Sequence, residues 1–441
     1  MNGGFGWMSV ARLGLVQACL GAVVVMTTST LNRVMVVELA LPALLPGLLV
    51  AMHYLVQVVR PRMGYGSDVG RRRTPWIVGG MAVLAVGGAL ASVATAWMGS
   101  DRVAGIALAV LAFALIGVGV SASGTSLLVL LASRVDAPRR AGAATLVWLM
   151  MIVGFAVTAG VAGKLLDPYS PLRLVAVTAA VSVIAMVTTL LATWRLEGAA
   201  APASIATPAT GHKASFREAL AQVWAEPVAR RFTIFVFISM LAYSAQDLIL
   251  EPFAGSVFGF TPGESTSLSG VQHGGVLLGM LAAALAGRGR RFGSLRAWQI
   301  GGCLMSALML MGLVAAAFVG SAWPFRATVF ALGAANGAFS IAAIASMMRL
   351  ASEGRHAREG VRMGLWGAAQ AVAFGMGGLV GTGASDLARW LIGTPATAYA
   401  VVFAFEAALF IIAAVLAARL SGGRLAAARP EARTPAHGVT A

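Results

Sequence analysis

The chain has 441 residues, of which 59% are hydrophobic and only 11% are charged. Soluble proteins carry about 25% charged residues, so this composition excludes an ordinary soluble fold. The net charge of +16 does not indicate nucleic-acid binding, because the 32 Lys and Arg residues are scattered through short segments and do not gather on one basic helix.

Twelve apolar stretches follow one another along the chain, each near the length of about 20 residues that a membrane-spanning helix needs. The seventh stretch, about 231–251, contains Asp247 and Glu251, and the twelfth, about 390–418, contains Glu406. Because an acid within a membrane span costs free energy, we expect function at these two stretches first. The other ten contain no Asp, Glu, Lys or Arg: 13–32, 39–59, 74–100, 103–133, 141–163, 174–194, 265–287, 297–325, 327–348 and 363–385.

The basic residues predict the orientation in the membrane. Positive residues are retained on the cytoplasmic side of short loops. Most of them lie in the amino-terminal segment, in alternate loops, in the central linker and in the tail, which predicts that both termini are cytoplasmic. The opposite set of loops contains only Arg33, Arg102, Lys164, Arg173, Arg326 and Arg389.

Two similar halves are expected. Residues 1–195 form one six-helix half and 231–419 the other, joined by a polar cytoplasmic linker at 196–230 and followed by a cytoplasmic tail at 420–441. The loop at 64–76 resembles the loop at 287–298 in its clustered Gly and Arg and its final Trp, which duplication explains. The predicted fold is an all-α transmembrane bundle of twelve helices in two halves.

The first of these loops resembles the signature loop of the major facilitator superfamily. Gly permits its tight turn, Asp caps and pairs, and Arg residues bind the helix ends. An Arg directly after the Asp, usual in that loop, is absent here. The matching residues are Gly64, Asp68, Gly70, Arg71 and Arg72.

A closer resemblance begins at the segments TLNRVMVVEL (30–39) and QDLILEPFAG (246–255). Both are similar to the PucC family, a branch of the major facilitator fold that includes the LhaA proteins, and the likeness covers essentially the whole chain. The resemblance implies that the protein handles bacteriochlorophyll or assists the assembly of light-harvesting complexes. It also implies a photosynthetic inner membrane and, as partners, light-harvesting polypeptides and a chlorophyll synthase.

Polar residues of these two segments lie near the non-cytoplasmic ends of the first and seventh spans, which line the centre of this fold. We expect Arg33 to form a charge pair with Asp247 or Glu251 that gates or braces that end of a cleft. Charges that reach interfacial water are the alternative. The expected network comprises Asn32, Arg33, Glu38, Gln246, Asp247 and Glu251.

His53 and His273 occupy the second and eighth spans, which are equivalent helices of the two halves. A neutral imidazole is a suitable axial ligand for the magnesium of a chlorin. Both are therefore candidate ligands of a bacteriochlorophyll or a precursor, and hydrogen bonding to a neighbouring helix is the alternative. Glu406 lies in the middle of an apolar span, where an unpaired carboxyl group is expected to be protonated.

Pigment handling is the favoured function. A proton-coupled transporter of a small hydrophobic solute, which would use Glu406, Asp247 or Glu251, is the alternative, and a scaffold that binds antenna polypeptides through Gly-rich helix faces is a third. Membrane lipid is an expected partner in each case. No nucleotide-binding loop, metalloprotease helix or nucleophile elbow appears, so the sequence predicts no catalytic or metal-binding residue and no enzyme.

Overall fold

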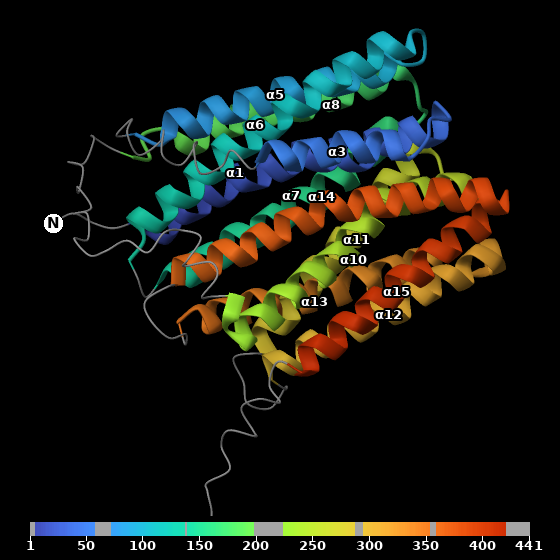
Figure 1. Ribbon diagram of the computed structural model, residues 1–441. Coiled ribbons are helices and arrows are strands. Elements are labelled where there is room, and N and C mark those ends of the chain that lie inside the picture. The colour runs from blue at the N-terminus through green and yellow to red at the C-terminus, as the bar shows by residue number, and fades with distance from the viewer. Residues whose placement is uncertain are drawn as a thin grey trace, which may run out of the picture.

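The computed structural model describes residues 5–57, 72–136, 139–197, 224–286, 294–352 and 359–419. This described part is helical and contains no strand. Figure 1 shows a bundle of long helices in which the blue-to-green first half lies beside the yellow-to-red second half. The expected linker lies mostly outside the described residues, and the expected tail lies wholly outside them.

The first half contains six helical rods. The first rod is continuous from Trp7 to Glu38 and changes its pitch along the way, because two π-helical turns interrupt the α-helix. Its parts are α1 (Trp7–Val25), η1 (Met26–Thr30), α2 (Leu31–Arg33) and η2 (Val34–Glu38); the other rods are α3 (Leu44–Val56), α5 (Thr74–Trp97), α6 (Arg102–Arg134), α7 (Arg140–Leu166) and α8 (Pro171–Thr193).

The second half repeats this arrangement with six rods and one short 3₁₀ turn, η5 (Gly320–Ala322). Its rods are α10 (Pro227–Phe258), α11 (Pro262–Ala286), α12 (Leu295–Val319), α13 (Phe325–Ser352), α14 (Glu359–Ile392) and α15 (Pro395–Arg419). Ten of the twelve rods are long and apolar enough to cross a membrane, and α3 is a shorter apolar helix. The prediction of twelve helices is therefore confirmed.

The packing of the helices supports duplication. In the first half α1 packs on α7 and α8, and in the second half α10 packs on the equivalent α14 and α15. Glycine permits the close approach in both halves. A Cβ on Gly154 of α7 would collide with the backbone of Ala18 on α1, and a Cβ on Gly377 of α14 would lie 2.6 Å from the carbonyl oxygen of Leu241 on α10.

Each half has its own apolar core, and the halves meet where the first rod, α3 and α7 of the first half lie against α10, α11 and α14 of the second. The segments η1, α2 and η2 lie against α10, α7 lies against α11, and α3 lies against α14. The first helices of the two halves therefore face each other, as expected. We call the end of the bundle at which η2 ends the Glu38 end, and the opposite end the Trp7 end.

Candidate functional site

The polar contacts between the halves begin in the π-helical part of the first rod. A π-turn rotates the side chains that follow it relative to an α-helix, and such turns occur often at functional sites. Here Ser29 and Thr30 face α11, although the earlier residues of α1 pack within their own half. The hydroxyl oxygens of Ser29 and Ser269 are 3.1 Å apart, and those of Thr30 and Thr266 are 3.0 Å apart.

Glu251 of α10 joins this group. Its side chain is only 2% exposed, and the Ser29 hydroxyl donates to its Oε1 atom. The hydroxyl groups of Ser265 and Ser269 also lie close to the carboxyl group. A carboxyl group buried between two halves is thus surrounded by hydroxyl donors from both of them.

Asn32 binds a backbone carbonyl that proline has left open. Pro252 lies inside α10, so the N–H that would normally bond to the carbonyl of Leu248 is missing. The side-chain amide of Asn32 donates to that carbonyl oxygen at 2.6 Å. Asn32 is 1% exposed and Leu248 is 3% exposed, so water does not compete for this bond.

Arg33 is fully buried but does not form the expected ion pair. Its Nη1 atom lies 2.5 Å from Oε1 of Glu38, and its Nη2 atom donates to the carbonyl oxygen of Phe260 at 2.5 Å. Glu38 takes the place of Asp247 or Glu251 because it follows Arg33 by five residues, the spacing that a π-turn brings to one side. Gly255 leaves room for the guanidinium group, since a Cβ there would lie 2.9 Å from Nη2.

Two aspartates that sequence analysis missed connect the halves at the Glu38 end. Asp386 of α14 accepts hydrogen bonds from the backbone N–H groups of Ala43 and Leu44, at 3.0 and 2.7 Å, where α3 begins. Asp167, directly after α7, accepts from the Thr261 hydroxyl at 2.9 Å and from the Gly263 N–H at 3.3 Å, where α11 begins.

These two contacts are the same kind of contact with the roles of the two halves reversed. In each of them an acid at the end of the fifth helix of one half caps the second helix of the other half. A carboxylate there also interacts favourably with the positive end of the helix dipole. The inter-half hydrogen bonds of Ser29, Asn32, Arg33, Asp167 and Asp386 all lie between the middle of the bundle and the Glu38 end.

The two candidate histidines differ in their surroundings. His53 is 2% exposed, and its Nε2 atom lies 2.9 Å from Nε2 of Gln57, one turn further along α3. His273 is half-buried on α11, and its Nδ1 atom donates to the carbonyl oxygen of Ser269 at 2.8 Å. Its ring contacts the ring of Phe155 on α7 edge to face, with centroids 4.9 Å apart.

The hydrogen bond of His273 determines what its other nitrogen can do. With Nδ1 as the donor, Nε2 is the acceptor in the neutral ring, and no described residue donates to it. Metal-binding histidines have this arrangement, in which a backbone carbonyl holds one nitrogen and the other is open. Among the described residues no group of three His, Cys, Asp or Glu side chains could hold a metal ion alone.

The remaining predicted residues divide between two places. Asp247 is half-buried, with the side chain of Gln272 on α11 as its hydrogen-bonding neighbour. Gln246 on α10 and Glu406 on α15 are both fully buried, and both helices belong to the second half. Of the signature loop, Gly64, Asp68, Gly70 and Arg71 lie outside the described residues, and Arg72 precedes α5.

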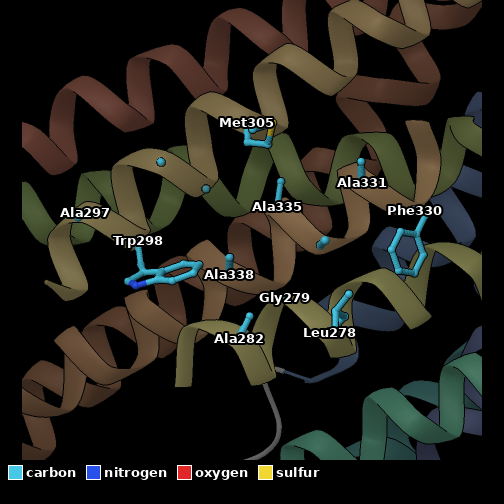
Figure 2. A pocket seen from close by; sticks show the side chains of 13 residues that line it. Leu278, Gly279, Ala282, Ala297, Trp298, Met305, Phe330, Ala331, Ala335 and Ala338 are labelled. Atoms are coloured by element: carbon cyan, nitrogen blue, oxygen red, sulfur yellow. The ribbon is translucent and has the colours of Figure 1, made fainter. Parts of the chain in front are cut away.

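A separate groove of about 620 Å³ lies between α11, α12 and α13. Figure 2 shows Trp298 and Phe330 at its two ends, with small side chains such as Ala335 between them. The groove is apolar and open on one side, and none of the predicted site residues lines it. Its surface is suited to the acyl chains of membrane lipid.

The fold and the contacts between its halves define a multi-pass membrane protein of the major facilitator type. A point mutant of the nucleoside transporter NupG superposes with a TM-score of 0.67 at 14% identity, over 93% of this chain and 99% of that chain. The D-xylose-proton symporter superposes with a TM-score of 0.68 at 16% identity, over 93% and 97%. At such low identity the likeness shows the fold alone.

The chain belongs to the PUCC protein family, whose model matches residues 30–425. The "Bacteriochlorophyll synthase 44.5 kDa chain" of Rhodobacter capsulatus is 54% identical over 426 residues, which cover 96% of this chain and 98% of that relative. "Protein PucC" of the same organism is 31% identical, over 94% and 92%. The family predicted from the two segments is confirmed, and the chain is a photosynthesis-related membrane protein.

Proposed function

We propose that the protein binds a (bacterio)chlorophyll, or a precursor of it, between its two halves and supports the assembly of light-harvesting complexes. The observation that carries this proposal is the open Nε2 atom of His273, whose ring is oriented by Ser269 and Phe155. A chlorin magnesium accepts one axial nitrogen ligand, and the adjoining aromatic ring suits the flat macrocycle. Family membership supports the same ligand class.

The inter-half contacts at the Glu38 end determine from which side of the membrane a pigment can reach this site. We propose that the Glu38 end is the non-cytoplasmic side of the photosynthetic inner membrane and that both termini are cytoplasmic, as the distribution of basic residues indicates. The inter-half contacts of Asp167, Asp386 and Arg33 then close the cleft on the non-cytoplasmic side. A pigment therefore enters from the cytoplasmic side or from the lipid on that side.

Light-harvesting polypeptides and a chlorophyll synthase are the partners that this role requires. The 54% identical relative is named as a chain of a bacteriochlorophyll synthase. We propose that this chain is itself not an enzyme, since no nucleophile, base and oxyanion donor converge among the described residues of this site. It would receive pigment from the synthase and transfer it to antenna polypeptides.

The test is a binding titration of the purified full-length protein with bacteriochlorophyll, followed by tryptophan fluorescence. We expect His273→Leu to weaken binding at least tenfold. The matched control is His53→Leu, which replaces the equivalent histidine of the other half, whose Nε2 atom already faces Gln57. Equal affinity of His273→Leu and the unsubstituted protein would exclude His273 as the ligand.

A proton-coupled carrier of a small hydrophobic solute is the second candidate. The observation in its favour is Asp247, a half-buried acid on a membrane-spanning helix with the side chain of Gln272 beside it. A carrier would be colourless when purified from its host and would take up solute only with a proton gradient, and Asp247→Asn would abolish that uptake.

A further inference from the structure

The core of the second half contains a polar layer between two layers of aromatic rings. Tyr243 of α10 and Phe410 of α15 both contact Phe339 of α13, with ring centroids 6.4 and 5.6 Å apart. Closer to the Glu38 end, Phe253 of α10 contacts Tyr399 of α15 at 5.5 Å. These ring contacts fix the relative heights of the three helices.

Three polar residues share the level between these layers. Gln246 follows Tyr243 by three residues, Asn336 precedes Phe339 by three, and Glu406 precedes Phe410 by four. The helix α10 runs towards the Glu38 end, whereas α13 and α15 run away from it. Each of the three polar residues therefore lies nearer the Glu38 end than the aromatic residue on its own helix. Each side chain therefore lies about 5 Å beyond the Tyr243, Phe339 and Phe410 cluster, on the same helix face as its ring.

The polar atoms of this layer lack partners. Gln246 and Asn336 are 0% exposed and Glu406 is 1% exposed. Within the described residues, no hydrogen bond is made by Oε1 or Nε2 of Gln246, by Nδ2 of Asn336 or by either carboxyl oxygen of Glu406. The Oδ1 atom of Asn336 does accept from the Ser306 hydroxyl, at 2.8 Å. Buried polar atoms in folded proteins almost always have a hydrogen-bonding partner, so five unpartnered atoms on one level point to a bound partner at this level.

We propose that Gln246, Asn336 and Glu406 form a buried binding site for water, with Glu406 present as the neutral acid. Water matches this set of atoms because it both donates and accepts, whereas a metal cation would face the two amide NH₂ groups. A buried water needs two to four polar partners, and the layer supplies five. The site lies inside one half and does not depend on the pigment proposal.

The surroundings of Glu406 explain why it is neutral. Among the described residues, the one titratable side chain whose charge acts on Glu406 is Asp247 on α10, which is itself acidic and supplies no countercharge. The part of α14 between residues 365 and 385 carries no charge. An ionised carboxylate without a countercharge is far more costly in an apolar core than a neutral acid hydrogen-bonded to water.

Infrared spectroscopy of the full-length protein in nanodiscs tests the protonation state. The spectrum of the unsubstituted protein minus that of Glu406→Gln should contain the carbonyl stretch of a protonated carboxylic acid, shifted in D₂O. A difference spectrum with carboxylate bands alone would overturn the proposal. Glu406→Gln has nearly the same shape and retains hydrogen-bonding atoms, so this variant is expected to fold.

A double-mutant cycle tests the bridging water. Gln246→Leu and Glu406→Leu each remove a hydrogen-bonding partner of the same water. The effect of Gln246→Leu on the unfolding equilibrium constant should therefore be about tenfold smaller in the Glu406→Leu background than in the unsubstituted protein. As a control, Gln299→Leu takes the place of Gln246→Leu in the cycle, and its effect should be the same with and without Glu406. Gln299 is a buried amide on another helix and donates to the carbonyl oxygen of Ala342. Additive effects of Gln246→Leu and Glu406→Leu would overturn the proposal.

Discussion

The bond from Asn32 to Leu248 gives a prediction in which one substitution should rescue another. Pro252 removes the N–H that would pair with the Leu248 carbonyl, and the Asn32 amide replaces it from the other half at 2.6 Å. Asn32→Leu leaves that buried carbonyl without its donor. We expect this variant to lose about 1–2 kcal/mol of unfolding free energy. The lower part of the usual range applies because Asn32 Oδ1, itself buried without a partner among the described residues, is removed as well.

Pro252→Ala restores the missing backbone donor. In the Asn32→Leu background it should recover at least half of the lost free energy, because the new N–H can bond to the Leu248 carbonyl within α10. In the unsubstituted protein the same change competes with Asn32 and should not stabilise. The measurement is reversible unfolding in mixed micelles, followed by the fluorescence of the 10 Trp residues.

Gln299→Leu is a matched control for this cycle. Gln299 also donates to a buried backbone carbonyl, that of Ala342 at 3.3 Å, but residue 346 is a serine with an N–H that can serve that carbonyl. Its removal should therefore cost less than Asn32→Leu. If Pro252→Ala had the same effect with and without Asn32, the reasoning that connects the proline to the asparagine would be refuted.

Three further changes test the closed Glu38 end. Replacing both Asp167 and Asp386 by Ala removes the two inter-half caps, each worth about 1 kcal/mol. In a Ser29→Cys background, which introduces a thiol between the halves, this change should increase thiol labelling from the non-cytoplasmic side; unchanged labelling would contradict their role. Gly255→Val places side-chain atoms against the Arg33 guanidinium and should destabilise the protein by about 1–3 kcal/mol. The control is Gly259→Asn, at a left-handed position with open space around it, which should change stability by less than about 1 kcal/mol. Glu38→Gln removes the ion-pair partner of buried Arg33 and should cost about 1 kcal/mol in the same unfolding assay, because the Glu38 side chain is 34% exposed and solvent screens the pair; an unchanged unfolding free energy would show that the pair contributes nothing to stability.

Hydropathy alone was enough to predict the twelve helices and the two halves. A spanning helix satisfies its own backbone and needs an apolar exterior, and both requirements are visible in the sequence. The meeting of the first helices was also predictable, because Asn32, Arg33 and Glu251 are too costly to expose to lipid. Their burial between η1, α2 and α10 confirms that expectation.

The partners of these residues could not be read from the sequence. The choice of Glu38 over Asp247 by Arg33 depends on a π-turn, and no simple residue pattern specifies such a turn. Gln246 and Asp247 are neighbours that point to different places, one into the core of the second half and the other towards α11. A rotation of about 100° per residue separates them, and the packing of α10 determines which face meets which neighbour.

Two features did leave signals that sequence analysis missed. Asp167 directly follows α7 and Asp386 lies within the last two turns of α14, so a comparison of the fifth helices of the two halves would have brought both acids to notice. Pro252 within an apolar span indicates an unpaired carbonyl four residues earlier, and therefore a donor from elsewhere. The sequence could not show that Asn32 is that donor, because 216 residues separate it from Leu248.

The absorption spectrum of the full-length protein, purified in mild detergent from its own host, tests the central claim most directly. We expect a (bacterio)chlorophyll band that remains with the protein through size exclusion, is retained by His53→Leu and is lost or shifted in His273→Leu. A colourless protein from pigmented cells, or a band that the His273→Leu variant retains unchanged, would contradict the claim that the two halves hold a pigment at His273.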